Sequence, residues 1–126
     1  MKRYNGFSNA TNTTSASSPL AGLGFSTTRA RVYDFMIGSD ATPADAASKF
    51  AWQRASTSGA ASGTAVVAPP LDPTDPAALV AYYSTWTTTQ PTITAVTSIL
   101  QVAMNQRATF RWVAVPDGEM ITGNTS

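Results

Sequence analysis

Two residue types that carry much of enzyme chemistry are missing from this chain of 126 residues, which contains neither cysteine nor histidine. Without cysteine there is no disulfide scaffold and no thiolate nucleophile. Without histidine there is no imidazole for acid–base catalysis, and the two absences together remove the usual ligands of zinc sites. The two absences therefore exclude most of the familiar kinds of active site.

Charged residues are also scarce, because they make up 12% of the chain, where about 25% is usual for soluble domains. Eight Lys and Arg against seven Asp and Glu leave a net charge of +1, which gives no reason to expect nucleic acid or an anionic membrane as a partner. A surface with so little charge is poorly protected against association. This is typical of a protein that works packed against neighbouring proteins.

Long apolar runs are the third absence. The N-terminal segment MKRYNGF has two basic residues but no apolar core after it, so we expect no signal peptide, and no run approaches a membrane span of about 20 residues. We expect the chain to be made in the cytoplasm. The N-x-S/T triplets at Asn9, Asn12 and Asn124 therefore carry no weight as glycosylation sites.

Residues 1–28 are predicted to form an extended N-terminal arm. Ser, Thr, Asn and Gly dominate this segment, and its apolar residues follow no helical or strand period. Its large apolar anchors are Tyr4, Phe7, Leu20, Leu23 and Phe25. They bury too little surface to offset the entropy lost on ordering the arm, so another protein surface has to hold it. We expect that surface to belong to another chain, bound through these anchors together with Arg29 and Arg31.

Residues 29–126 are predicted to form one β-domain, because short alternating runs are separated by Gly and Pro. The expected strands cover 29–37, 49–56, 64–68, 91–105, 108–115 and 120–122. The run 91–105 is long enough for one bent strand or two. The four residues 116–119 predict a tight turn, with Gly118 accepting a positive φ. Asp75-Pro76 is compatible with a short helix over 77–82.

The class predicted from this pattern is all-β. A small antiparallel β-sandwich, of jelly-roll or immunoglobulin type, suits short strands without long helices. Within it, Arg31, Tyr33, Phe35 and Ile37 are expected on one face of their strand. Trp52 and Trp112 share an alternation face with phenylalanines and are expected in the core.

Loop carboxylates offer two weak candidates for chemistry. Asp40, Asp45, Asp72 and Asp75 lie in two loops, but their spacing matches no calcium loop, and turn chemistry explains them. Asp117 and Glu119 lie in a turn, whereas glycoside hydrolysis needs two acids across a cleft. We therefore expect no catalytic residue, no metal and no cofactor.

Charged residues within the predicted strands and one aromatic group are candidates for binding contacts rather than for catalysis. Asp34 either faces water or pairs across a sheet with Arg54, Arg107 or Arg111. The arginines at 29, 31, 107 and 111 are expected to form ion pairs at an interface, since the chain has almost no net charge to attract phosphate. The candidates for an exposed surface anchor that contacts a partner are Tyr82, Tyr83 and Trp86. Their aromatic rings would also suit the binding of a sugar.

Three blocks carry a resemblance to a known class of proteins: RVYDFMIGSDATPAD, VVAPPLDPTDPAA and NQRATFRWVAVPDGEM. They resemble capsid decoration (cement) proteins of tailed bacteriophages over most of the chain from Arg31 to Ile121, leaving the arm uncovered. The resemblance implies a compact β-domain without enzymatic activity that binds major capsid proteins on the virion surface. It also implies a homo-oligomer, and we favour a trimer over a dimer.

Three other hypotheses remain open at this point. A receptor- or glycan-binding module of the virion would use the aromatic residues near 82–86. A tail or connector subunit would form a ring with a lumen. A hydrolase is the least favoured, because no nucleophile elbow or phosphate loop is present in the sequence.

Overall fold

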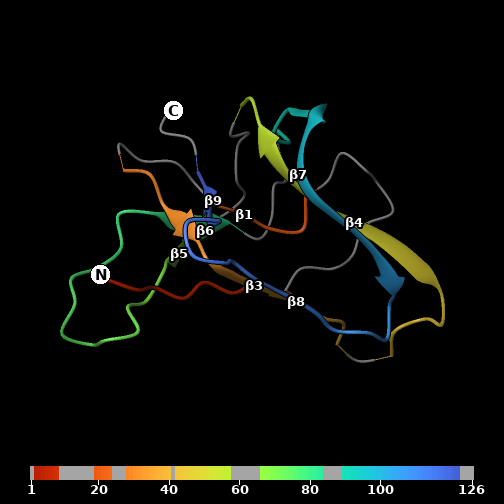
Figure 1. Ribbon diagram of the computed structural model, residues 1–126, viewed down its shortest axis with the longest axis horizontal. Helices are drawn as coiled ribbons and strands as arrows, with labels where there is room; N and C mark the ends of the chain where they lie inside the picture. Colours follow the sequence, from red (N-terminus) through yellow and green to blue (C-terminus); the bar gives the residue numbers. More distant parts are fainter. Residues whose placement is uncertain are drawn as a thin grey trace. The chain divides into compact units, whose positions relative to one another are not determined.

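The computed structural model describes residues 2–8, 19–23, 28–40, 42–57, 66–83 and 89–122. Within these residues all regular secondary structure is β, as nine strands (Figure 1). The all-β prediction is confirmed. The strands pair into several small sheets rather than one large one.

The chain divides into two compact units, which are described separately. Unit 1 contains Met1–Ala30, Ala55–Ile93 and Thr122–Ser126, and unit 2 contains Arg31–Arg54 and Thr94–Ile121. Unit 2 is therefore built from two segments that are far apart in the sequence.

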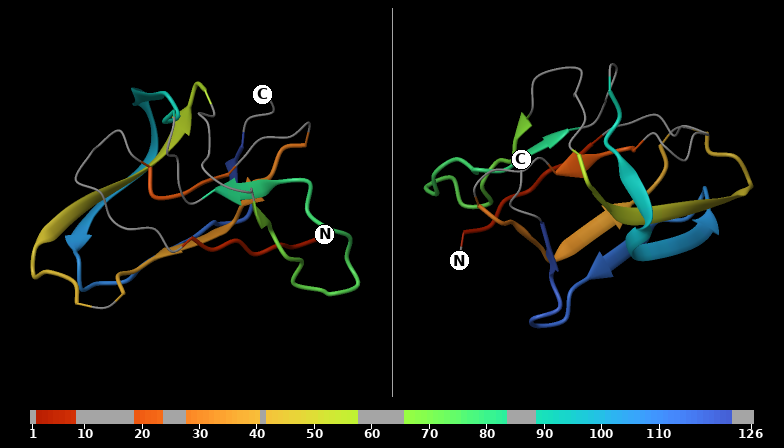
Figure 2. Two further views of the ribbon diagram at one scale, coloured as in Figure 1. Left: turned by 180° about the vertical axis from the view of Figure 1, so that it is seen from behind. Right: turned by 90° about the horizontal axis from the view of Figure 1, so that it is seen from above.

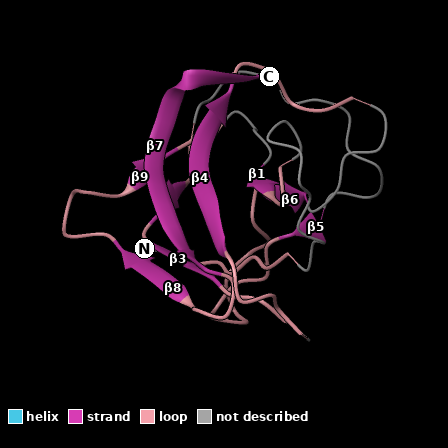
Figure 3. Cartoon of the chain, turned by 90° about the vertical axis from the view of Figure 1, so that its right-hand side faces the viewer, coloured by secondary structure: helices cyan, strands magenta, loops and turns pink. Residues whose placement is uncertain are grey.

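Unit 1 contains a three-stranded sheet with the order β1-β6-β5, built from β1 (Gly22–Leu23), β6 (Ala81–Tyr83) and β5 (Val66–Val67). Both neighbours run antiparallel to β6, with Leu23 and Val66 each opposite Tyr82. Figure 3 shows the three short strands together. Since β1 comes from the segment expected to be an arm, part of that segment is a strand of the chain's own sheet.

The first residues of the chain are also paired within unit 1. Tyr4 forms a bridge with Pro70, the Asn5 amide donates to the Pro69 carbonyl at 3.0 Å, and the Leu71 amide donates to the Arg3 carbonyl at 2.9 Å. The described part of residues 1–28 thus finds backbone partners in its own chain, whereas the sequence argument favoured another chain.

The short helix expected over 77–82 is wrong. Residues 77–80 have no regular structure, and 81–83 form β6. Because β6 lies between β1 and β5, its backbone groups are bonded on both edges. A helix of six residues would gain only one or two internal hydrogen bonds after a costly nucleation, so the sheet is favoured.

Unit 2 contains two short antiparallel pairs and one long pair. The short pairs are β2 (Arg31–Val32) with β9 (Met120–Ile121), and β3 (Asp34–Ile37) with β8 (Phe110–Val113). The long pair is β4 (Ala47–Ala55) with β7 (Ile93–Asn105), whose end residues Ala55 and Ile93 belong to unit 1. Figure 2 shows β4 and β7 side by side. The run 91–105 therefore forms one strand, not two.

The strand expected over 29–37 is interrupted at Tyr33. Val32, Phe35 and Ile37 are half-buried, while Arg31, Tyr33 and Asp34 are exposed, so the alternation changes phase between Val32 and Asp34. The predicted common face of Arg31, Tyr33, Phe35 and Ile37 is wrong. The interruption lets β2 pair with β9 while β3 pairs with β8.

The expected turn forms one residue earlier than 116–119, over 115–118, with the Gly118 amide donating to the Val115 carbonyl at 2.9 Å. The positive φ, however, belongs to Asp117 at 63° and not to Gly118. Asp tolerates this conformation at the third position of a turn better than most residues. Gly118 is needed for space, since an added Cβ would lie 2.8 Å from Val115 Cγ2. The strand after this turn, β9, does not return beside β8 but pairs with β2.

Aromatic packing forms the interior of unit 2. Phe35 and Trp52 meet edge to face with ring centroids 5.0 Å apart. Phe50, Phe110 and Trp112 are half-buried, as expected for an inward alternation face. Among the side chains whose burial the structure describes, Met120 is the one large apolar side chain that is buried, with 8% of its surface exposed. The interior is therefore small.

Replacing Met120 with alanine is expected to destabilise the chain by about 2–3 kcal/mol, because it opens a cavity in this small interior. Leu79→Ala is the control, since Leu79 is 71% exposed and its loss should change stability by less than about 0.5 kcal/mol. Urea denaturation of both variants measures the difference. Equal stability of the two variants would contradict the placement of Met120.

Candidate partner-binding surfaces

The outer face of the β3–β8 pair carries one charged pair between apolar side chains. Asp34 lies opposite Val113 and Met36 lies opposite Arg111. These four residues are exposed, whereas their neighbours Phe35, Ile37, Phe110 and Trp112 are half-buried. We call Asp34, Met36, Arg111 and Val113 the β3–β8 outer face.

Asp34 and Arg111 form a bidentate ion pair across this face. Arg111 Nε donates to Asp34 Oδ1 at 3.0 Å, and Nη2 donates to Oδ2 at 2.6 Å. Of the three partners that the sequence left open for Asp34, the structure selects Arg111. The hydrogen bonds from Arg111 hold the pKa of Asp34 below its ordinary 3.8, and they raise the pKa of Arg111 in turn.

The pKa of Asp34 gives a test of this pair. Its lowered pKa means that the folded state favours the charged carboxylate, so the pair contributes stability at neutral pH and loses that contribution as the pH falls through the folded-state pKa. Carboxyl carbon shifts measured by NMR should place the midpoint of Asp34 below 3.8. Arg111→Gln should move the midpoint upward, and an unchanged midpoint would refute the pair.

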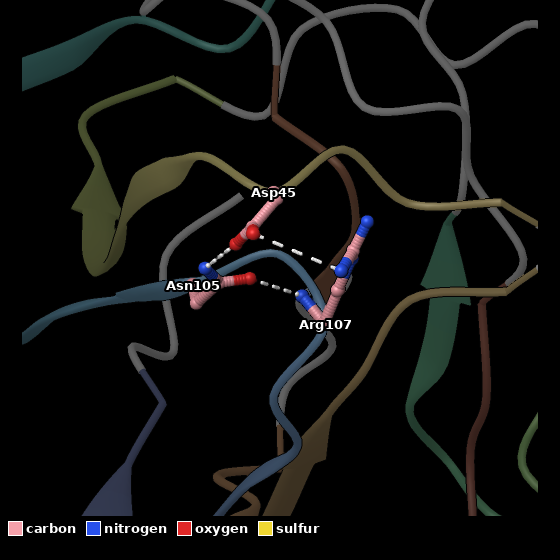
Figure 4. A network of polar contacts seen from close by, with 3 residues as sticks. All are labelled: Asp45, Asn105 and Arg107. Carbon is pink, nitrogen blue, oxygen red and sulfur yellow. Dashed lines mark hydrogen bonds and ion pairs between the residues drawn. The ribbon is translucent and has the colours of Figure 1, made fainter.

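Arg107, also expected at an interface, forms contacts within unit 2. Arg107 Nη1 lies 3.7 Å from Asp45 Oδ2, and its amide donates to Asn105 Oδ1 at 2.9 Å. Asn105 Nδ2 donates to Asp45 Oδ1 at 2.6 Å, which closes the network shown in Figure 4. We call it the Asp45 network; it ties the end of β7 to the segment before β4 and is exposed.

Three further arginines differ in the groups that they contact. Arg31 Nη1 lies 3.8 Å from Glu119 Oε2, and Arg54 Nη2 donates to the Ile121 carbonyl at 3.2 Å. Arg29 is exposed. The predicted ion pairs of Arg31, Arg107 and Arg111 thus exist, but inside one chain rather than across an interface.

A hollow of about 300 Å³ lies within unit 2. It is lined by Arg54, Ile99, Leu100, Trp112, Gly118, Glu119, Met120 and Ile121. Glu119 is the only carboxylate in this lining, and Asp117 is not part of it. Because glycoside hydrolysis by two acids needs a second carboxyl group about 5–10 Å away across the cleft, the lining of this hollow does not supply that chemistry.

Asp72, one of the loop carboxylates considered for calcium, serves a local turn. Asp72 Oδ1 accepts hydrogen bonds from the Thr74 amide at 2.9 Å and from its hydroxyl at 2.7 Å, and these bonds lower the pKa of Asp72. The Asp75 amide donates to the Asp72 carbonyl at 3.0 Å. Across the part of the chain that the structure describes, no three acidic, His or Cys residues gather in a way that could hold a metal ion.

The anchors expected in the arm have different environments. The Tyr4 hydroxyl donates to the Pro76 carbonyl at 3.2 Å, and the Leu20 carbonyl accepts from Ser8 Oγ at 3.2 Å. Tyr4, Leu20 and Leu23 are half-buried, whereas Phe7 is 72% exposed. Phe25 lies outside the described residues.

Tyr82 is the residue on which the arm packs, a contact that sequence reasoning missed. The Phe7 and Tyr82 rings have centroids 6.3 Å apart, and a Cβ added to Gly6 would lie 3.0 Å from Tyr82 Cδ1. The sequence signal that could have found it is Gly6 beside Phe7, since glycine allows backbone to approach a ring closely. Tyr83 lies opposite Gly22 in β1, and Trp86 lies outside the described residues.

Loss of the Tyr82 ring is expected to release the start of the chain. In Tyr82→Ala, the Asn5 and Leu71 amides, which donate across the pairing of residues 3–5 with 69–71, should exchange with solvent at least about tenfold faster, because local opening becomes easier. Tyr33→Ala in unit 2 serves as the control. Hydrogen exchange measured by NMR reports both sites, and unchanged protection in Tyr82→Ala would contradict the contact.

Comparison with known proteins found no matching family model, curated protein or solved structure. A search of the described residues for helices long and apolar enough to cross a membrane found none. A functional hypothesis for this chain therefore has to be argued from its own residues.

Proposed function

We propose that this chain is a non-enzymatic structural protein of a tailed-bacteriophage virion, a decoration protein that binds major capsid proteins and stabilises the assembled shell. The proposal includes the antiparallel sandwich and the N-terminal arm expected from the sequence, a homo-oligomeric state, and a location on the capsid surface. Its main support is the imbalance between exposed and buried apolar side chains.

That imbalance is large. Among the side chains whose burial the structure describes, one large apolar side chain, Met120, is buried, eleven are exposed, and the others are half-buried. The exposed set is Phe7, Tyr33, Met36, Val66, Val67, Leu71, Leu79, Ile99, Val113, Val115 and Ile121. Single exposed apolar residues are ordinary, but a domain that buries so few of them gains little hydrophobic stabilisation by itself. A protein that completes its apolar burial against a partner explains this pattern.

In unit 1 the exposed set suggests how the capsid would be contacted. Phe7 and Leu79 are 72% and 71% exposed, and Leu71 follows at 57%. Tyr4, Leu20 and Leu23 would hold the arm on its own unit, leaving Phe7 to be offered to the partner. Of the arm residues expected from the sequence to bind the capsid, Tyr4, Leu20 and Leu23 would therefore position the arm, and Phe7 would make the contact.

Stabilisation of the shell would follow from linkage. A protein that binds the assembled capsid and not its separated subunits shifts the equilibrium toward the assembled state by mass action. A homo-oligomer would add effective concentration, so several weak apolar contacts could give firm attachment. No chemistry at a catalytic centre is needed for this role.

The glycan-binding alternative has less support in the described residues. A sugar platform needs exposed aromatic faces. Tyr82 has Gly6 and Phe7 against its ring, and Tyr83 is half-buried in β6. The surroundings of Tyr82 therefore favour a role in anchoring the arm.

The test uses empty heads of the bacteriophage that encodes this chain, from which the chain itself has been removed. The purified chain should sediment with the heads and raise their disruption temperature, while Leu79→Asp and Leu71→Asp should weaken binding by roughly tenfold or more, because each places a charge in an apolar contact. Ala77→Asp, which adds the same charge at an exposed position of the same loop region, should bind as the wild type does. Failure of the wild-type chain to bind the heads would overturn the proposal.

A further inference from the structure

The β3–β8 outer face has features that the capsid proposal does not use. Met36 is 66% exposed and Val113 is 55% exposed, and the Asp34–Arg111 pair lies between them in the register of the two strands. Val115, just beyond β8, is 71% exposed. The face therefore combines exposed apolar side chains with one positive and one negative group, and has no net charge.

The ion pair keeps unused hydrogen-bonding capacity. Arg111 binds Asp34 through Nε and Nη2 only, although a guanidinium has five N–H donors. The carboxylate accepts two hydrogen bonds from Arg111 and one from the Phe35 amide, while it has room for about four. The side chain of Arg111 is 62% exposed and that of Asp34 is 33% exposed, so both can be reached by a partner.

Such a pair is complementary to a copy of itself. A rotation of 180° about an axis between the two groups, parallel to the sheet, brings the Asp34 of one copy over the Arg111 of the other, and the reverse. The remaining N–H donors then face the remaining carboxylate acceptors, in an arrangement of four alternating charges. Met36 and Val113 of one copy would contact apolar side chains of the other copy, around the four charged groups.

We propose that the β3–β8 outer face is a dimerisation surface on which a second copy of this chain docks with two-fold symmetry. Charge complementarity selects this occupant. A strongly charged partner would gain nothing from a face without net charge, and a purely apolar partner would cover the ion pair without satisfying its remaining donors and acceptors. A second copy satisfies both the charges and the apolar residues.

Two-fold symmetry also decides between the oligomers considered from the sequence. A two-fold contact uses the same surface on both copies, whereas a trimer joins two different surfaces head to tail. Because the outer face is self-complementary, it favours a dimer over the trimer first expected. This inference concerns the chain in solution and holds whether or not the chain binds capsids.

Charge reversal tests the inference directly. Asp34→Arg makes the face wholly positive and Arg111→Asp makes it wholly negative, so each variant alone should dimerise roughly a hundredfold more weakly than the wild type, because like charges would meet. Mixed together, the two variants should form a heterodimer. The double variant Asp34→Arg/Arg111→Asp should dimerise with itself. Sedimentation velocity measures the homodimers, and energy transfer between labelled variants measures the mixture.

The Asp45 network provides the matched control, because Asp45 and Arg107 are also an exposed ion pair of unit 2. Asp45→Arg and Arg107→Asp should leave dimerisation unchanged. Near-UV circular dichroism, which reports the packing of Trp52 and Trp112, confirms that each variant is folded; a variant that is not folded is replaced by Met36→Lys, which should also weaken the dimer.

Three results would overturn the inference. The first is a wild-type chain that stays monomeric, or forms a trimer, at high micromolar concentration. The second is a mixture of the two charge-reversed variants without heterodimer. The third is equal loss of dimer in the control variants. Loss of capsid binding in Asp34→Arg, with a monomeric wild type, would assign the face to the capsid instead and equally overturn it.

Discussion

The edge-to-face contact between Phe35 and Trp52 is the interaction on which unit 2 depends. It joins β3 to β4, and therefore links the short β3–β8 pair to the long β4–β7 pair. Two-stranded sheets are at best marginally stable in water, so packing between pairs has to supply what hydrogen bonds within each pair do not. Met120 is the one large apolar residue that is buried among those whose burial the structure describes, so the aromatic contact shares this role mainly with half-buried side chains such as Phe50, Phe110 and Trp112.

The low content of charged residues and the limited burial of apolar side chains have the same physical consequence in this chain, because both favour attraction between protein molecules. A low content of charged residues reduces repulsion between molecules, and exposed apolar side chains provide attraction. The few ion pairs present, such as that of Asp34 and Arg111, are local and leave little field beyond the surface. The proposed association with other protein surfaces would follow from this composition, and the sheets would decide which residues are offered to a partner.

Sequence periodicity predicted the strands well where alternation was regular. The runs around Trp52 and Trp112 form β4 and β8 with the expected residues facing inward, and the segment ending at Asn105 is one strand. Pairing could not be predicted, because it depends on contacts distant in sequence. The phase change at Tyr33 and the strand at Tyr82–Tyr83 in place of a helix both arise from such pairing. The choice of Arg111 by Asp34 likewise follows from the β3–β8 register, which a single sequence does not contain.

The pairing of β2 with β9 joins the first and last segments of unit 2, since Arg31 lies opposite Ile121. During synthesis, β2 leaves the ribosome long before its partner exists, and contacts between such distant residues form slowly because a long loop must close first. The nascent chain thus carries an unpaired β2 edge until β9 emerges. Unpaired strand edges of this kind promote premature self-association, so the late pairing of β9 would protect the chain as well as complete unit 2.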